Sequence, residues 1–223
     1  INREDFIEDG ILMTSTHIKY EVQNIEQEQS EFDPFTLERY KQFSNFFLKG
    51  TLKVLDVGCN TGRGGAYLKE ICPSLELFGL DCVRDRLNAL PSCYSHRIYG
   101  LSTEIPEEDN CFDAIVAGEF LEHLYPIDVD RTICEFQRVL KIGGRLLLTT
   151  PNPNYLKNKI SRTSIYGVSH LTQHYPRILR HRLLSHGFSN VRIYGSGKVS
   201  RYLGYHFPIK SLYGSYLVIA DKF

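Results

Sequence analysis

The sequence lacks the features that would mark an export or membrane-spanning protein. It contains no run of about 18 apolar residues, the length that a membrane-spanning helix needs. Its first residues, Ile1 to Asp5, have neither the basic nor the apolar stretch of a signal peptide. We therefore expect a cytoplasmic protein without a membrane span.

Net charge and clustered cysteines are also absent. The 26 lysines and arginines equal the 26 aspartates and glutamates, so no overall field would concentrate a polyanion, which disfavours a nucleic-acid partner. The six cysteines form no Cys-x-x-Cys pair and do not cluster with histidine. This spacing disfavours a zinc site, so we expect reduced cysteines and no bound metal.

The composition that remains is that of one globular domain. At 223 residues, with 42% hydrophobic and 23% charged residues, the chain is long enough to bury a sizeable core. The polar residues 1–31 are expected to form an N-terminal arm or helix, and residues 32–223 a single domain. Within that domain, residues 151–215 are rich in tyrosine and histidine.

Strand-like and helix-like patterns alternate along the domain. Strands are expected at residues 53–57, 76–80, 97–100, 114–117, 145–149, 191–194 and 215–219, and helices at residues 37–47, 64–71, 83–90, 128–140 and 176–185. This alternation predicts an α/β fold with a doubly wound, mostly parallel, seven-stranded Rossmann-like sheet and helices on both faces. The last two strands are expected to form an antiparallel C-terminal edge.

A buried strand that runs straight into a glycine turn and a helix is the strongest functional signal. Gly58 allows a sharp turn off the strand, and Gly62 allows close approach of a ligand. The first turn of the following helix offers unpaired N–H groups. We therefore expect a ligand to lie over this turn.

Asp81 ends the next expected strand, about twenty residues beyond the glycine turn. In an open α/β sheet, a carboxylate at this position can accept both ribose hydroxyls of a nucleoside. Dinucleotide-binding proteins share this feature, but the spacing from Gly58 to Gly62 does not fit Gly-x-Gly-x-x-Gly. The sequence therefore favours a ligand with a single nucleoside over a dinucleotide.

These residues resemble the first motif of class I methyltransferases, an acidic residue followed by x-Gly-x-Gly-x-Gly. Asn60 replaces the central glycine, and asparagine tolerates the left-handed backbone best after glycine. The resemblance extends over about residues 50–152, through the segments 105–113, 116–124 and 138–144. It implies S-adenosylmethionine as cofactor, with residues 151–215 forming the acceptor region.

The resemblance also implies which residues bind that cofactor. Asp81 and Cys82 would contact the ribose side, Ser102 and Thr103 the adenine, and Glu119 the methionine portion. Leu101 stands where many relatives have aspartate, which makes the adenine contacts a departure from the pattern. The remaining cofactor residues are those of the turn: Asp56, Gly58, Cys59, Asn60 and Gly62.

Three histidines are candidates for the base that takes the proton of an acceptor hydroxyl: His123, His170 and His174. Each has the alternative interpretation of a hydrogen-bonded structural residue. Glu119 and Glu122 precede His123 at helical spacing, so they would lie on one side of a helix. With a later histidine they also resemble the metal site of small-RNA 3′-terminal 2′-O-methyltransferases.

The acceptor is predicted from resemblance alone. The turn at residues 151–154, the segment 169–171 and the segment 185–188 resemble bacterial polysaccharide-associated methyltransferases, which favours a sugar hydroxyl of a glycan precursor. The alternatives are a small quinone or phenol, a metal-dependent RNA 2′-O-methyltransferase and a non-catalytic cofactor-binding module. The late aromatic residues are interpreted as a stacking surface for the acceptor or as the edge of the core: Tyr194, Tyr202, Tyr205, Phe207, Tyr213 and Tyr216.

Overall fold

The computed structural model describes residues 6–8, 11–13, 15–25, 33–166 and 169–223. Seven strands form one sheet in the order β5-β4-β3-β6-β7-β9-β8. These strands are β3 (Lys53–Val57), β4 (Glu76–Asp81), β5 (Tyr94–Tyr99), β6 (Phe112–Gly118), β7 (Leu140–Pro151), β8 (Phe188–Ser196) and β9 (Ser215–Lys222). The expected seven-stranded sheet is confirmed.

Strand direction changes only at the C-terminal side of this sheet. The pairs β3–β4, β4–β5, β3–β6 and β6–β7 are parallel, whereas β9 is antiparallel to both β7 and β8. In the parallel part, Leu55 lies opposite Phe78 of β4 and Ile115 of β6. The parallel strands end at one edge of the sheet, which is where ligands bind in open α/β folds.

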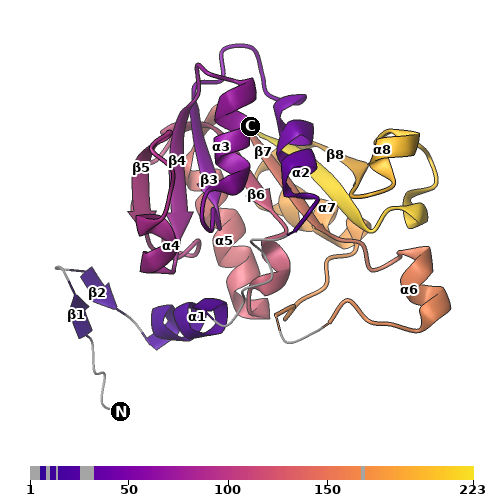
Figure 1. The fold of residues 1–223 in the computed structure, drawn as a ribbon, viewed down its shortest axis with the longest axis horizontal. Helices are drawn as coiled ribbons and strands as arrows, with labels where there is room; N and C mark the ends of the chain where they lie inside the picture. The colour runs from indigo at the N-terminus through magenta and orange to yellow at the C-terminus, as the bar shows by residue number, and fades with distance from the viewer. Residues whose placement is uncertain (1–5, 9–10, 14, 26–32, 167–168) are drawn as a thin grey trace.

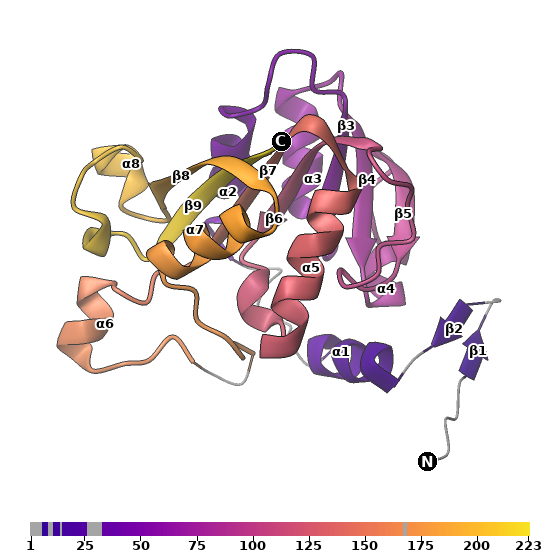
Figure 2. The same ribbon diagram turned by 180° about the vertical axis from the view of Figure 1, so that it is seen from behind.

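Helices cover both faces of the sheet (Figures 1 and 2). One face carries α2 (Thr36–Ser44) and α3 (Arg63–Ile71), and the other carries α5 (Pro126–Val139) and α7 (Pro176–Ser185). Alternate residues of each strand face opposite sides, so Val54 joins the core with Phe43 of α2, and Leu55 joins the core with Ile133 of α5. Two buried apolar layers therefore fix the position of the strand ends.

The structure adds short elements to those that periodicity predicted. They are β1 (Phe6–Glu8), β2 (Ile11–Met13), α6 (Leu156–Ser161), α8 (Ser200–Leu203) and the 3₁₀ turns η2 (Leu121–His123) and η3 (Lys210–Leu212). The helix predicted at residues 83–90 is α4 (Arg84–Asn88), and α1 (Ser15–Ile25) lies within the predicted N-terminal arm. The predicted strand at 145–149 is longer than expected, because β7 continues through Gly143 and Gly144. Gly143 has a left-handed φ of 77°, and the register between β6 and β7 shifts at this point, between Phe112 and Ala114 of β6.

The N-terminal helix α1 lies beyond the carboxyl ends of β3 and β4 (Figure 1). Tyr20 is 3% exposed, and its hydroxyl donates to Asp128 Oδ2 of α5 at 2.7 Å and accepts the N–H of Tyr125 at 2.9 Å. The predicted N-terminal arm of residues 1–31 thus includes the helix α1. Nothing in the residue pattern indicated that this helix packs onto the domain at the carboxyl ends of the strands.

The link between β8 and β9, residues 197–214, lies at the outer edge of the sheet (Figure 1). The Gln42 side chain of α2 donates to the Gly195 carbonyl and accepts from Ser196 Oγ, both at 2.8 Å, which ties the start of the link to the domain. Tyr213 and Tyr216 are at most 1% exposed. Of the two interpretations of the late aromatic residues, the burial of Tyr213 and Tyr216 supports the edge of the core and not a stacking surface.

Among the residues that the structure describes, no helix combines the length and apolar character needed to cross a membrane.

Candidate functional site

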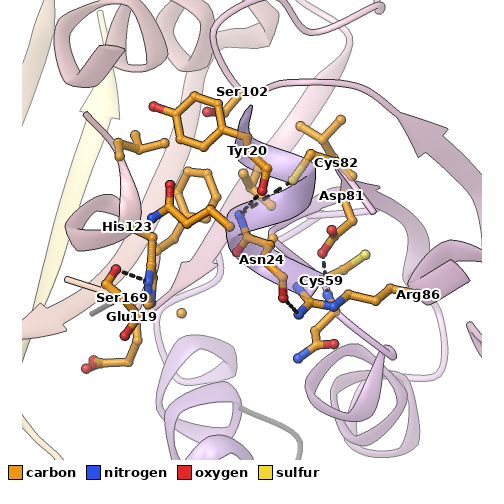
Figure 3. A pocket seen from close by; sticks show the side chains of 18 of the residues that line it. Tyr20, Asn24, Cys59, Asp81, Cys82, Arg86, Ser102, Glu119, His123 and Ser169 are labelled. Atoms are coloured by element: carbon orange, nitrogen blue, oxygen red, sulfur yellow. Dashed lines mark hydrogen bonds between the residues drawn. The ribbon is translucent and has the colours of Figure 1, made fainter. Parts of the chain in front are cut away.

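A cavity of about 1240 Å³ lies at the carboxyl ends of β3, β4 and β6 (Figure 3). It is larger than the roughly 300–1,000 Å³ typical of single-ligand pockets, so it has room for a cofactor and part of an acceptor. Its walls include eight of the ten predicted cofactor residues: Gly58, Cys59, Asn60, Asp81, Cys82, Ser102, Thr103 and Glu119. His123 and His170 line the same cavity.

The turn after β3 has the left-handed backbone that its sequence predicts. Gly58, Asn60 and Gly62 have φ values of 64°, 52° and 79°. A Cβ at Gly58 would lie 2.6 Å from the Phe120 ring, and one at Gly62 would lie 2.6 Å from Leu90. Gly62 is therefore required for packing and does not line the cavity, contrary to the expectation of close ligand approach.

Asp56, the last residue but one of β3, holds the turn in position. It is fully buried, and its carboxylate accepts the Tyr40 hydroxyl at 2.6 Å and the Tyr94 hydroxyl at 2.5 Å. Burial raises the pKa of Asp56 to about 7, although the two tyrosine hydrogen bonds oppose that shift. Asp56 does not line the cavity, so its predicted cofactor contact is replaced by a structural role: it joins α2 and β5 to the strand that carries the turn.

Asp81 is positioned by two backbone N–H groups at the end of β4. Its Oδ2 accepts from Asn60 N at 2.9 Å, and its Oδ1 accepts from Val83 N at 3.0 Å. Each carboxylate oxygen has a second lone pair, so both can still accept from ribose hydroxyls. The Asp81 pKa is raised by burial, while Arg86 and the backbone donors oppose that effect.

The predicted adenine residues lie together but are not equally available. Ser102 is 7% exposed, and its hydroxyl shares a 2.8 Å hydrogen bond with Thr132 Oγ1 of α5. The Ser102 hydroxyl therefore already has a hydrogen-bond partner within the protein. The wall at this end is completed by Cys82, Leu101 and Thr103.

Glu119 follows β6 in a left-handed conformation, with φ of 51°. Its N–H donates to the Thr149 carbonyl and to Thr149 Oγ1, both at 3.0 Å, which holds this backbone in place. Its Oε2 accepts from Ser215 Oγ of β9 at 3.1 Å. The carboxylate therefore stands at the end of three neighbouring strands.

Arg39 of α2 is a cavity residue that sequence reasoning missed. Its side chain is 10% exposed, its Nε lies 3.5 Å from Glu119 Oε1, and its guanidinium also pairs with Asp33. Arg39 Nε and Glu119 Oε1 are both buried without a hydrogen-bond partner. Spacing alone did not separate Arg39 from the solvated charges of an amphipathic helix.

Two of the three predicted histidines meet at the cavity. The N–H of Leu171 donates to the Glu122 carbonyl at 2.7 Å, which brings His170 beside η2. The rings of His123 and His170 are 5.1 Å apart and nearly perpendicular. Their Nδ1 atoms lie 2.8 Å from the carbonyl oxygens of Ser169 and Ile165.

The carbonyl partners determine how the two rings can act. A carbonyl only accepts, so each Nδ1 carries the hydrogen, and a neutral ring has its lone pair on Nε2. Burial, aided by nearby His170, lowers the pKa of His123 to about 4. His123 is therefore neutral at physiological pH.

His174 does not reach the cavity. It is 4% exposed, its Nε2 lies 2.9 Å from Thr172 Oγ1, and burial lowers its pKa to about 4. Its carbonyl accepts the hydroxyl of Tyr216. The structural interpretation replaces the catalytic one for this histidine, because its side chain is enclosed between β9 and the segment that leads to α7.

Glu122, His123 and His170 form a cluster that could hold a metal ion, since their ligand atoms lie within 4.8 Å of one another. Glu122 is fully buried, and burial together with nearby Glu119 raises its pKa well above the usual value. Glu119 itself is not part of this cluster. The structure therefore brings together three of the four residues of the alternative metal site, namely Glu122, His123 and a later histidine.

The helix α1 forms one wall of the cavity, which the sequence did not suggest (Figure 3). The Asn24 amide lies 3.8 Å from Cys82 Sγ, and the Asn24 carbonyl accepts from the Arg86 guanidinium. Tyr20 lines the cavity from the same helix. Residues far apart in sequence thus close the cavity beside Cys82 and Arg86.

Fold and site together define a nucleoside-binding α/β domain in which the glycine turn and Asp81 face one cavity. Residues 55–148 match the model of the methyltransferase domain family. By fold and by this match, the matched segment is a methyltransferase domain, and both findings support S-adenosylmethionine as its cofactor.

Curated relatives agree with this assignment over the same part of the chain. The chain is 32% identical over 117 residues to the mitochondrial ubiquinone biosynthesis O-methyltransferase of Rattus norvegicus, covering 47% of this chain and 32% of that protein. It is 36% identical over 109 residues to a fatty-acid O-methyltransferase of Mycolicibacterium smegmatis, covering 46% and 38%. The chain thus spans about a third of the length of these relatives.

Solved structures show the same fold. A methyltransferase from Thermotoga maritima, described as a possible histamine N-methyltransferase, superposes with a TM-score of 0.67 at 18% identity, covering 93% of this chain and 99% of that one. A methyltransferase from Archaeoglobus fulgidus gives 0.64 at 22% identity, covering 83% and 92%.

The Asp56 site predicts a specific pH dependence of stability. Its carboxyl titrates near 3.8 when unfolded and about 7 when folded, so its contribution falls as pH rises between those values. In Asp56→Asn, the loss of unfolding free energy between about pH 5 and 8 should shrink by roughly 2 kcal/mol. Urea unfolding measures this change.

Asp85→Asn, on the exposed face of α4, is the matched control. It should retain the pH dependence of the parent protein. If Asp56→Asn and the parent show parallel curves, the Asp56 carboxyl is already ionised in the folded protein and the account of this buried group is wrong.

Proposed function

We propose that this chain transfers a methyl group from S-adenosylmethionine to a hydroxyl oxygen, and that the acceptor is a sugar hydroxyl of a glycan precursor. The observation that carries the proposal is the continuity of one cavity, from Asp81 and the Asn60 turn to Glu119, His123 and His170. One end has groups suited to a nucleoside, and the other has groups suited to a proton transfer.

The residues present fit the cofactor. Asp81 offers lone pairs to the ribose, and Gly58 and Asn60 line the cavity beside it. Arg39 Nε and Glu119 Oε1 form an ion pair but no hydrogen bond, and they offer a cation and an anion to the carboxylate and ammonium of a methionine moiety. When bound, the sulfonium supplies an electrophilic methyl group.

The protein would contribute alignment and a base. Holding two reactants in line removes much of the entropic barrier to transfer. His170 Nε2 is the proposed proton acceptor, because its Nδ1–H is directed at the Ile165 carbonyl and its ring lines the cavity. His123, whose pKa is lowered by burial to about 4, would pack edge-on against His170 and orient its ring.

The polar residues of the lining support a sugar acceptor, although the apolar part of the lining is the larger part. Around the histidines it includes Ser169 and Ser215 in addition to Glu119 and Arg39. A quinone or phenol acceptor remains the main alternative, because the rat relative is named for ubiquinone biosynthesis. Labelled cofactor offered with sugar, phenol and quinol acceptors distinguishes them: label in phenols or quinols alone would contradict the sugar proposal.

Two adenosine compounds separate the two halves of the cofactor site. Arg39→Ala should weaken S-adenosylhomocysteine binding by about 10- to 100-fold, the cost of a charge-assisted hydrogen bond. It should leave 5′-methylthioadenosine binding unchanged, since that compound has no amino-acid group. Asp81→Ala should weaken binding of both compounds, because both carry the ribose.

Calorimetry measures the four affinities, with Asp81→Asn as the conservative variant that keeps one acceptor oxygen. If Arg39→Ala weakens both compounds equally, Arg39 acts on the shape of the whole site. If Asp81→Ala binds 5′-methylthioadenosine like the parent, the ribose assignment is lost.

The base is tested by His170→Ala. We expect kcat to fall by about 10²- to 10⁴-fold, with S-adenosylhomocysteine affinity unchanged, because only the proton transfer is removed. His181→Ala, on the exposed side of α7, should behave like the parent. Equal turnover of His170→Ala and the parent across the pH range would remove the base from the mechanism.

A metal-assisted transfer is a second candidate, and the Glu122–His123–His170 cluster favours it. In that case a chelator should abolish turnover and added Mn²⁺ should restore it. Our primary proposal expects turnover to survive chelation. Calorimetric titration of the protein with Mn²⁺, compared with His170→Ala, reports binding at the cluster independently of activity.

A further inference from the structure

The zero net charge hides a strong separation of charge along the chain. Residues 136–220 contain thirteen lysines and arginines and no aspartate or glutamate. The preceding 135 residues carry 25 of the 26 acidic residues. The whole chain has no net charge, but its two parts, residues 1–135 and 136–220, have strong net charges of opposite sign.

Among the described residues, the fold places much of the basic group toward one end of the sheet. Residues 136–220 form β7, β8, most of β9 and the helices between them, which occupy one end of the sheet opposite β5 and α4 (Figures 1 and 2). The molecule is therefore electrically polar along its sheet, with a basic end at β8 and α6.

Many of these cations are neutralised, but those of α6 are not. Arg138, Arg145 and Arg201 pair with Glu135, Asp221 and Glu38. Within the described part of the chain, no ion pair involves the exposed side chains on and just after α6: Lys157, Lys159 and Arg162.

Exposed apolar side chains lie among these cations. Leu156 and Ile160, one helical turn apart on α6, are 43% and 76% exposed, and Tyr166 is 55% exposed. Ile209, 52% exposed, precedes η3, which packs against α6. We call Leu156, Lys157, Lys159, Ile160 and Arg162 the α6 surface.

The α6 surface is attached to the mouth of the cavity. The Asn152 amide donates to the carbonyls of Lys210 and Tyr213, both at 2.9 Å, which fixes the start of the segment. At its end, His170 Nδ1 lies 2.8 Å from the Ile165 carbonyl. The segment that exposes the cations and apolar side chains thus leads directly into the wall of the active site.

We propose that the α6 surface docks the protein on an anionic lipid bilayer, with the cavity mouth close to the membrane. Cations that flank exposed aliphatic side chains match an interface of anionic headgroups over acyl chains. Single-stranded nucleic acid would favour several exposed aromatic rings for base stacking, whereas Leu156 and Ile160 of the α6 surface are aliphatic and Tyr166 is a single ring outside the helix. An acceptor presented at a membrane would then reach the cavity without leaving the bilayer.

The test measures binding of the full chain to two kinds of vesicle, pure phosphatidylcholine and an equal mixture with phosphatidylglycerol. We expect co-sedimentation with the mixed vesicles only, and loss of it at high salt. Lys157→Glu/Lys159→Glu should lower the partition coefficient at least about tenfold, since each basic residue contributes about 1 kcal/mol near such a surface. Ile160→Ser should lower it without any change of charge.

Lys41→Glu/Lys49→Glu is the matched control. It changes the net charge equally, but these exposed lysines belong to α2 and the loop before β3. It should bind the mixed vesicles within about twofold of the parent, a difference well below the effect of one basic residue. Circular dichroism confirms that each variant is folded.

Three outcomes would overturn the proposal: no preference for anionic vesicles, equal loss in the α6 variant and the control, or binding to a single-stranded RNA oligomer without binding to vesicles. The measurement contains no methyl transfer. Failure of the docking proposal therefore leaves the proposed function standing, and failure of the proposed function leaves the docking result unchanged.

Discussion

The buried contact of Asp56 with Tyr40 and Tyr94 is the constraint on which the site depends. It joins the end of β3 to α2 and β5, so the turn above it has one position relative to both. From that turn, Asn60 N holds Asp81, and α2 places Arg39 beside Glu119. The positions of the proposed cofactor residues, which are distant in sequence, therefore all depend on this one buried carboxyl.

Much of the fold could be predicted because its signals are local. The alternation of apolar strands and amphipathic helices needs only the period of the sequence, and the left-handed turn at Gly58 and Asn60 needs only residue type. Boundaries were less predictable: β7 begins before its two glycines because Leu140 already pairs with Phe112 of β6.

The site was harder to predict because tertiary contacts decide which candidate residues reach the cavity. Sequence spacing treated His170 and His174 alike, but the Leu171–Glu122 hydrogen bond brings the first to the cavity, while Thr172 and β9 enclose the second. Gly62 and Asp56 belong to the motif, yet they pack beneath the cavity. Arg39 and α1 carry no motif, and only folding shows that they line it.

The most direct measurement of the central claim is a crystal structure with S-adenosylhomocysteine. The account predicts ribose hydroxyls within hydrogen-bond distance of Asp81 and the amino-acid group between Arg39 and Glu119. The ligand bound elsewhere, or the ribose turned away from Asp81 with the Asp56 contact intact, would contradict it.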